Sequence, residues 1–162
     1  MLKPIKIKSK IFSDVRGKIF ENYTHSKGIQ YPYSITSISK KNVLRGFHFT
    51  LGGEYKILSV IKGKIIDYCF MINKNNIKKY KFILNQGESL LLPKFFAHAY
   101  LCLGNENIIN YHLSKIYDQK KKKIIKWNDP NLRIDWKIKK PILSDADNNA
   151  ESLVSCKKKY FS

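Results

Sequence analysis

Two histidine-containing segments of the chain combine the residue types that proton transfer or metal binding requires. The first runs from Gly46 to Gly63 and contains His48 and Glu54, and the second, residues 87–98, ends at His98. A neutral imidazole can take up a proton near neutral pH, and imidazole and carboxylate groups also bind transition metals. The residue types alone therefore leave two chemistries open, general base catalysis and a metal site.

Short strands are the elements that must position these segments. Hydrophobic and polar residues alternate with period two over residues 5–11, which is typical of a strand with one buried face. Further β-rich runs, separated mostly by glycine or asparagine, cover residues 55–61, 65–72, 80–84, 89–92 and 107–113. The break at Lys62–Lys64 indicates a hairpin or tight turn. This pattern predicts one all-β domain over residues 1–162, a barrel or sandwich with few short helices, one of them near residues 147–154.

The charge of the chain is its strongest compositional feature. There are 31 Lys and Arg residues against 12 Asp and Glu, a formal net charge of +19. Such a charge attracts polyanions, but arginines are few and no nucleic-acid-binding motif is present, so we do not expect nucleic acid as the partner. A basic cleft does suit the phosphates of a nucleotide.

The composition also bears on where the protein works. No apolar run approaches the roughly 20 residues of a membrane-spanning helix, and the N-terminus lacks the apolar block of a secretory signal. The three cysteines form no CxxC pair, which suits a reducing compartment. We therefore expect a cytoplasmic protein without a membrane partner.

The two histidine segments resemble the two sequence motifs of the cupin superfamily. The resemblance implies a double-stranded β-helix, or jelly-roll barrel, with His48, Thr50, Glu54 and His98 pointing into its mouth. Metal-binding cupins use these four positions as ligands, but Thr50 stands where they have a second histidine, and a hydroxyl is a poor ligand for a transition metal. We therefore expect a site without metal, with His48, Glu54 and His98 as a three-ligand alternative. Phe95 replaces a turn glycine of the second motif, which predicts a different turn geometry.

A longer resemblance appears when the flanking residues are included. Residues 43–49, VLRGFHF, are similar to the "VLRGLHFQ" stretch of the dTDP-4-dehydrorhamnose 3,5-epimerase family, and residues 93–100 follow its "P-x-GFAHGF" apart from Phe95 and Ala99. Other segments match in the same order: "D-x-RG-x-F-x-E" at 14–21, "Y-x5-Y" at 111–117, "WNDP" at 127–130, "I-x-W" at 134–136 and "LS-x-x-D" at 143–147. The similarity covers about residues 10–147.

The resemblance implies a role for each of these residues. His48 is expected to be the base that removes a proton beside a ketone, with Asp147 orienting its ring and Asp67 as the reserve candidate for that role. Tyr111 is expected to return a proton to the opposite face, and Lys56 to steady the enolate oxygen. These are the tasks that epimerisation beside a ketone requires. Arginines, acids and aromatic residues are expected to hold the substrate: Arg16, Glu21, Arg45, His98 and Tyr117.

The function implied is epimerisation at C3, C5 or both of a nucleotide-linked 4-keto sugar, for surface polysaccharide such as lipopolysaccharide. We expect no cofactor, and a homodimer whose N-terminal strand pairs across subunits. Tyr33 and Ile35 fall where the family has Gln and Asn, which predicts a different or less hydroxylated sugar. The sugar, the nucleobase and the pathway stay open, as do two alternatives on the same fold: a nucleotide-sugar 3,4-ketoisomerase and a non-catalytic sugar-nucleotide-binding cupin.

Overall fold

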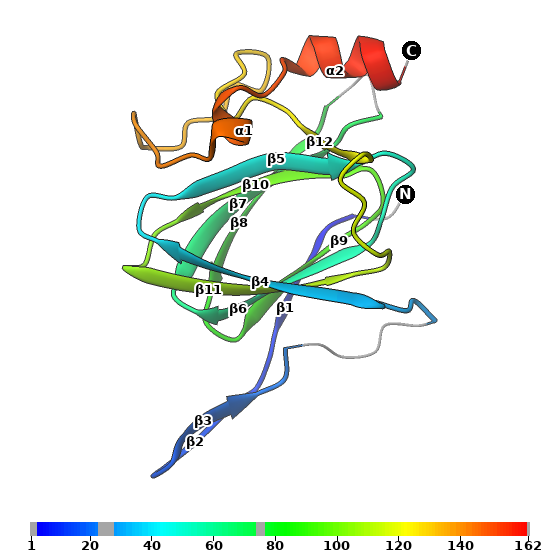
Figure 1. Cartoon of the computed structure of the whole chain (residues 1–162). Coiled ribbons are helices and arrows are strands. Elements are labelled where there is room, and N and C mark those ends of the chain that lie inside the picture. Colours follow the sequence, from blue (N-terminus) through cyan, green and yellow to red (C-terminus); the bar gives the residue numbers. More distant parts are fainter. Residues whose placement is uncertain (1–2, 23–27, 74–76, 162) are drawn as a thin grey trace.

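The computed structural model describes residues 3–22, 28–73 and 77–161, and most of its strands form two five-stranded antiparallel sheets that face each other (Figure 1). The first sheet has the order β1 (Ile5–Lys8), β9 (Glu88–Leu92), β6 (Lys56–Lys62), β11 (Glu106–Leu113) and β4 (Tyr33–Lys40). The second has the order β12 (Lys122–Ile124), β5 (Leu44–Thr50), β10 (Phe96–Cys102), β7 (Lys64–Met71) and β8 (Lys79–Asn85). The prediction of an all-β cupin barrel is confirmed.

The chain changes sheet at the break that the sequence placed between two β-rich runs. Strand β6 pairs with β9 and β11, whereas β7 pairs with β8 and β10, so the prediction of a hairpin at this break is wrong and the alternative, a tight turn, holds. Gly63 makes the turn at φ +91°, and a Cβ there would lie 2.5 Å from the carbonyl oxygen of Glu106. Only glycine fits this approach of two backbones, so the turn carries the chain from one sheet to the other.

Strand β10 is buried along its whole length because it has cores on both faces. Phe96 and Tyr100 belong to a cluster between the two sheets, whereas Ala97, Ala99 and Leu101 belong to a cluster on the outer face of the second sheet. Successive side chains of a strand point to opposite faces. Burial on both faces explains why the sequence here is almost continuously apolar instead of alternating.

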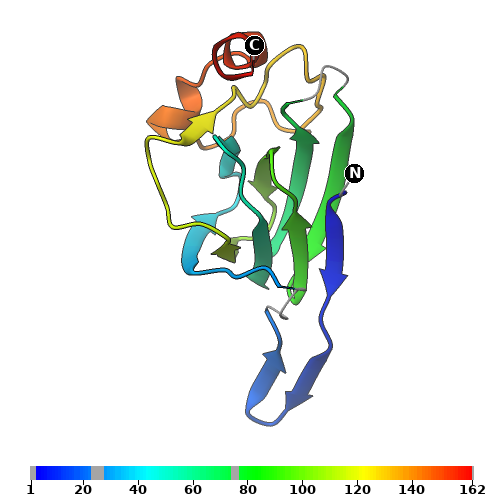
Figure 2. The same cartoon turned by 90° about the vertical axis from the view of Figure 1, so that its right-hand side faces the viewer.

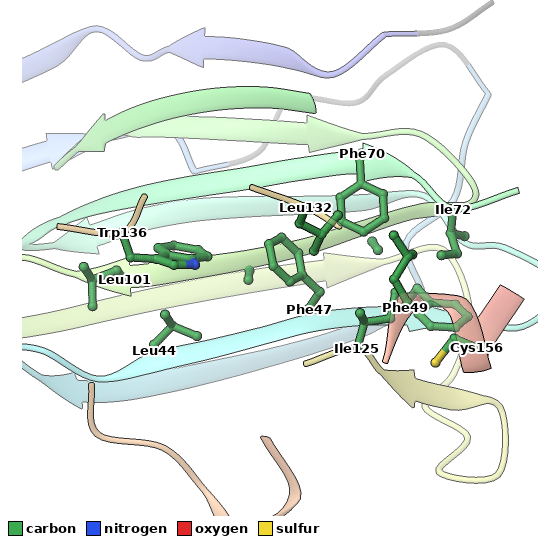
Figure 3. Packing of buried hydrophobic residues seen from close by; sticks show 13 residues of the cluster. Leu44, Phe47, Phe49, Phe70, Ile72, Leu101, Ile125, Leu132, Trp136 and Cys156 are labelled. Carbon is green, nitrogen blue, oxygen red and sulfur yellow. The ribbon is translucent and has the colours of Figure 1, made fainter. Parts of the chain in front are cut away.

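The C-terminal segment covers the outer face of the second sheet. The ring of Phe47 lies 5.3 Å from that of Phe70 and 5.9 Å from that of Trp136 (Figure 3). Two short helices, α1 (Asp145–Asn148) and α2 (Leu153–Tyr160), lie over β5 and β12 (Figure 1). The single helix expected over 147–154 is therefore two helices. Ser152 caps a separate α2 by accepting a hydrogen bond from the backbone N–H of Ser155.

A two-stranded hairpin, β2 (Ile11–Asp14) and β3 (Gly17–Phe20), projects away from the barrel (Figure 2). The alternating run of residues 5–11 is thus split between β1 and β2, and β1 pairs with β9 of its own chain. Four apolar residues of the hairpin are exposed: Ile11 at 39%, Phe12 at 54%, Val15 at 104% and Ile19 at 71%. Among the described residues, no helix is long and apolar enough to cross a membrane.

Gly46 sets the register of β5 against β10. The pairing of these strands shifts between His98 and Tyr100, and Gly46, at φ +119°, lies opposite the shift. An irregularity of this kind turns the next side chain to the other face. Arg45 and His48, three residues apart, both line the cavity as a result. A Cβ at Gly46 would collide with the carbonyl oxygen of His98 and lie 2.7 Å from the Cα of Ala99.

We predict that Gly46→Ala destabilises the protein by about 2 kcal/mol or more, because it adds a backbone collision to the strain of a positive φ. The midpoint of thermal unfolding, followed by circular dichroism, should fall by at least about 4 °C. Gly17→Ala is the matched control, since Gly17 has a similar φ of +129° with nothing within 4 Å of the added Cβ. Equal losses in the two variants would contradict the proposed role of Gly46.

Candidate active site

One open cavity lies between the two sheets, with about 710 Å³ of space when the solvent at its mouth is included. His48 of β5 and His98 of β10 reach it from the second sheet, and Lys56 of β6 and Tyr111 of β11 reach it from the first. The two side chains expected to exchange protons with a substrate, His48 and Tyr111, therefore line the same cavity from opposite sheets.

A buried carboxylate holds the ring of His48. The Nε2 atom of His48 lies 2.7 Å from Oδ1 of Asp147, which is only 3% exposed. Ser144, the N-cap of α1, fixes that carboxylate: its hydroxyl donates to Oδ2 of Asp147 at 2.8 Å and accepts from the backbone N–H of Asp147. The backbone N–H of Gly46 donates to Oδ1 at 3.4 Å. A carboxylate that accepts the proton of one ring nitrogen leaves the other nitrogen free to act as a base.

The environment of this pair sets its protonation. Burial lowers the pKa of His48 below its ordinary value, and the hydrogen bond with Asp147 offsets part of that shift. Burial works to raise the pKa of Asp147, but hydrogen bonds with His48, Ser144 and Gly46 outweigh it and the pKa is lowered. At neutral pH the pair is thus a neutral imidazole beside a carboxylate, which is the state that a general base needs.

A second histidine–carboxylate pair lies deeper in the barrel. Oδ2 of Asp67 lies 2.9 Å from Nδ1 of His98, and Nζ of Lys56 lies 3.3 Å from its Nε2. Asp67, the reserve candidate for orienting His48, therefore contacts His98 instead. Burial lowers the pKa of Lys56, and Glu54, whose carboxylate is 3.6 Å away, offsets part of the shift. The ammonium of Lys56 thus lies beside this pair and lines the cavity.

The metal-ligand positions of cupins have other partners here. Glu54 accepts a hydrogen bond from the hydroxyl of Thr50 at 2.9 Å, and both histidine rings contact carboxylates. In the part of the chain that the structure describes, no three His, Cys, Asp or Glu side chains are grouped so that they could hold a metal ion.

Tyr111 is a protonated acid within this cavity. Its side chain is 9% exposed, and burial raises the pKa of its phenol well above the ordinary value. Its hydroxyl donates to the hydroxyl of Tyr100 at 2.8 Å. The cavity therefore has a neutral imidazole on one sheet and a neutral phenol on the other, because burial disfavours the charged form of each group.

The residues expected to hold the substrate divide into two groups. Arg45 and Tyr117 line the cavity together with His98, and Tyr117 stacks on Tyr33 with 6.3 Å between ring centroids. Arg16 does not line it: this side chain sits at the turn of the projecting hairpin, is 85% exposed and pairs with Asp14. Glu21 follows the same hairpin, is exposed and also lies outside the cavity lining.

Several cavity residues escaped the interpretation of the sequence. Lys122 lies within a run of lysines that carries no periodic signal, so nothing distinguished it. Ser37 also lines the cavity, and Tyr100 lies beneath it. Tyr100 follows His98 by two residues on a strand, so period two predicts that both share a face. It is also a third departure from "P-x-GFAHGF", which ends in phenylalanine.

Phe95 corrects a further expectation. It adopts φ +66°, the left-handed conformation that glycine favours, instead of a different turn geometry. Its carbonyl oxygen accepts a hydrogen bond from the backbone N–H of Ile72 at 2.9 Å, which ties the turn to the end of β7.

The double-stranded β-helix, with a histidine–carboxylate pair and a buried tyrosine on one cavity, defines a cupin-fold protein with groups suited to proton transfer. A family model described as dTDP-4-dehydrorhamnose 3,5-epimerase matches residues 3–155, so the chain belongs to that family and is a carbohydrate epimerase by class. The enzyme of that name from Escherichia coli K12 is 31% identical over 145 residues, which cover 80% of this chain and 78% of that protein. The one from Methanothermobacter thermautotrophicus is 28% identical over 164 residues, covering 92% and 89%.

Solved structures agree with this assignment. The dTDP-4-dehydrorhamnose 3,5-epimerase of Bacillus anthracis, solved with TDP and pyrophosphate bound, superposes with a TM-score of 0.85 at 26% identity and covers 92% of this chain and 93% of its own. The dTDP-6-deoxy-D-glucose-3,5-epimerase of Legionella pneumophila, in complex with dTDP-4-keto-L-rhamnose, gives 0.88 at 25% identity, with 97% and 91% covered.

The His48–Asp147 pair predicts a defined pH dependence. The rate constant kcat/KM should rise as His48 loses its proton, with an apparent pKa below 6.5. In Asp147→Asn the carboxylate that favours the charged imidazole is absent, so this pKa should fall further and the acidic limb should move to lower pH. Loss of the ring's orientation should lower kcat/KM by about 10²-fold or more. A limb that stays in place or moves to higher pH would contradict the assignment.

Proposed function

We propose that the chain epimerises C3, C5 or both of a dTDP-linked 4-keto-6-deoxy sugar. The observation that carries this proposal is the placement of His48, with its carboxylate partner, and Tyr111 on opposite sheets around one cavity. Epimerisation removes a proton from one face of a carbon and returns one to the other face, so it requires a base and an acid that approach from opposite sides.

The steps assign one task to each group. His48 takes the proton from the carbon beside the ketone and becomes an imidazolium that Asp147 stabilises. Lys56, whose ammonium lines the cavity, stabilises the oxygen of the resulting enolate. Tyr111 then donates its phenolic proton to the opposite face of the carbon. The proposed steps use no cofactor.

The lining of the cavity supports the substrate class. Arg45 and Lys122 are cations on the lining, and they suit the diphosphate of a nucleotide sugar. Ile35 and Leu113 are apolar residues of the same lining, and they suit a sugar carbon without a hydroxyl. The complex of the Legionella relative with dTDP-4-keto-L-rhamnose supports a dTDP-linked ligand.

We place the enzyme in the cytoplasm, as a supplier of activated deoxy sugar for surface polysaccharide such as lipopolysaccharide. Membership of the dTDP-4-dehydrorhamnose 3,5-epimerase family, which is named for a nucleotide-linked deoxy sugar, supports this role. Support for the compartment comes from Cys69, Cys102 and Cys156, which are all free thiols.

We also propose that the chain works as a homodimer in which the β2–β3 hairpin reaches the cavity of the partner. The hairpin exposes Phe12, Val15 and Ile19, and exposed apolar clusters of this kind mark interaction surfaces. It also carries Arg16, which the sequence assigned to substrate binding but which lies away from the cavity of its own chain. A second copy of the protein accounts for both observations, because it covers the exposed apolar side chains and places Arg16 beside a cavity.

The proton-transfer steps are tested with dTDP-4-keto-6-deoxy-D-glucose in D₂O. The wild type should incorporate deuterium at C3, C5 or both, read by NMR of the sugar. His48→Ala and Tyr111→Phe should each lower product formation by about 10²-fold or more while the far-ultraviolet circular dichroism stays unchanged. Failure of the wild type to introduce deuterium at either carbon would overturn the proposal, and a product with its ketone at C3 would identify a ketoisomerase instead.

The homodimer is tested by complementation between two inactive variants. His48→Ala lacks the base and Arg16→Ala lacks the hairpin cation, but a mixed dimer contains one cavity with both groups intact. Co-expression should restore activity to about a quarter of the sites, the statistical expectation for random pairing in a two-fold dimer. A monomeric mass by light scattering, or no recovery in verified mixed dimers, would contradict the arrangement.

A further inference from the structure

Three hydroxyl groups form a continuous hydrogen-bonded chain from Tyr111 back to the cavity. The hydroxyl of Tyr111 donates to that of Tyr100 at 2.8 Å. The hydroxyl of Tyr100 lies 2.9 Å from Oγ of Ser37, a half-buried residue of β4 that lines the same cavity. Tyr100 itself is 1% exposed and lies beneath the cavity, between the two lining residues.

The direction of the first bond fixes the direction of the others. Because Tyr111 donates to Tyr100, the proton of Tyr100 is available for Ser37, and the proton of Ser37 is then available to the cavity. A hydroxyl has one donor and two acceptor positions, so each member can serve both neighbours. In the resting state the phenolic proton of Tyr111 is thus engaged with Tyr100. The direction of each hydrogen bond must reverse before Tyr111 can donate into the cavity and still accept a bond from Tyr100.

The three hydrogen-bonded hydroxyl groups also provide a way to reprotonate Tyr111, which the proposed function requires. After one turnover His48 carries an extra proton and Tyr111 lacks one. A buried phenolate is costly, and burial raises the pKa of Tyr111 well above its ordinary value. Tyr111 therefore needs a new proton as it gives up its own, and its hydroxyl is hydrogen-bonded to that of Tyr100, with Ser37 as a second hydrogen-bonding neighbour.

We propose that Tyr100 is a positioning residue that orients the acid Tyr111 and relays a replacement proton to it from Ser37. This inference rests on the proposed function. The carbon receives the proton of Tyr111, the oxygen of Tyr111 receives that of Tyr100, and the oxygen of Tyr100 receives that of Ser37. A water molecule in the cavity reprotonates Ser37, and the hydroxide so formed is neutralised by the proton that His48 releases to solvent. The protons balance over one cycle.

The hydroxyl of Tyr100 is not needed to fill the barrel. The related family motif ends in phenylalanine at this position, and the ring of Tyr100 packs against those of His98 and Tyr111, each with 6.5 Å between centroids. A buried hydroxyl is costly unless it is hydrogen-bonded, and that of Tyr100 has partners on both sides. Tyr100→Phe should therefore fold and remove the relay alone.

The test measures kcat with dTDP-4-keto-6-deoxy-D-glucose in mixtures of H₂O and D₂O. In the wild type, several protons in flight should make kcat a curved function of the deuterium fraction. In Tyr100→Phe, kcat should fall about 10-fold or more and the dependence should become linear. Tyr68→Phe is the matched control, because the hydroxyl of Tyr68 donates to the carbonyl oxygen of Asp135, outside the cavity.

A second variant guards against a folding defect. Ser37→Ala removes the hydroxyl group at the half-exposed end of the relay and should lower kcat by a similar factor. The double variant with Tyr100→Phe should lose no more activity than Tyr100→Phe alone. A wild-type dependence that is linear from the start would overturn the relay, as would a Tyr100→Phe variant that keeps the curvature, with or without a loss of rate. A wild type that introduces no deuterium would instead overturn the proposed function.

Discussion

The hydrogen bond between His48 and Asp147 is the contact on which the active site depends, because it joins the barrel to a segment about one hundred residues further along the chain. Asp147 reaches β5 only because the C-terminal segment packs across the outer face of the second sheet. The backbone of Leu44 donates to the carbonyl oxygen of Ile142 at 3.0 Å, and Ser144 then begins the short helix that carries the carboxylate. The apolar cluster around Phe47 therefore does more than stabilise the fold: it brings the carboxylate of Asp147 to the ring of His48.

Two sheets that face each other supply the second requirement, since they separate the proposed base from the proposed acid. His48 belongs to one sheet and Tyr111 to the other, with the cavity between them. The same burial shifts their pKa values in opposite directions, downward for the imidazole and upward for the phenol. Both groups are neutral before reaction as a consequence, so one is ready to accept a proton and the other to donate one. The environment, more than the residue types, determines these roles.

Much of this arrangement follows from sequence, and the exceptions have physical reasons. The family resemblance placed Tyr111 across the site from His48, and the cupin motif placed His48 at the barrel mouth. Side-chain periodicity does not reveal which strands pair with each other. The sequence therefore left a hairpin and a tight turn open at Gly63, where the polypeptide passes from one sheet to the other. The position of Arg16 also escaped prediction, since a residue on a projecting hairpin has no place in the cavity of its own chain. The hydrogen bond between Tyr100 and Ser37 joins strands of different sheets, so no local pattern in the sequence predicts it.

The most direct measurement of the central claim is a crystal structure with dTDP-4-keto-6-deoxy-D-glucose or its reduced analogue bound. The account predicts that the sugar ring lies in the cavity between the two sheets, with C3 or C5 within about 3.5 Å of the free ring nitrogen of His48 and the hydroxyl of Tyr111 near the opposite face. A sugar bound outside the cavity, or held with both side chains on one face of the ring, would contradict it.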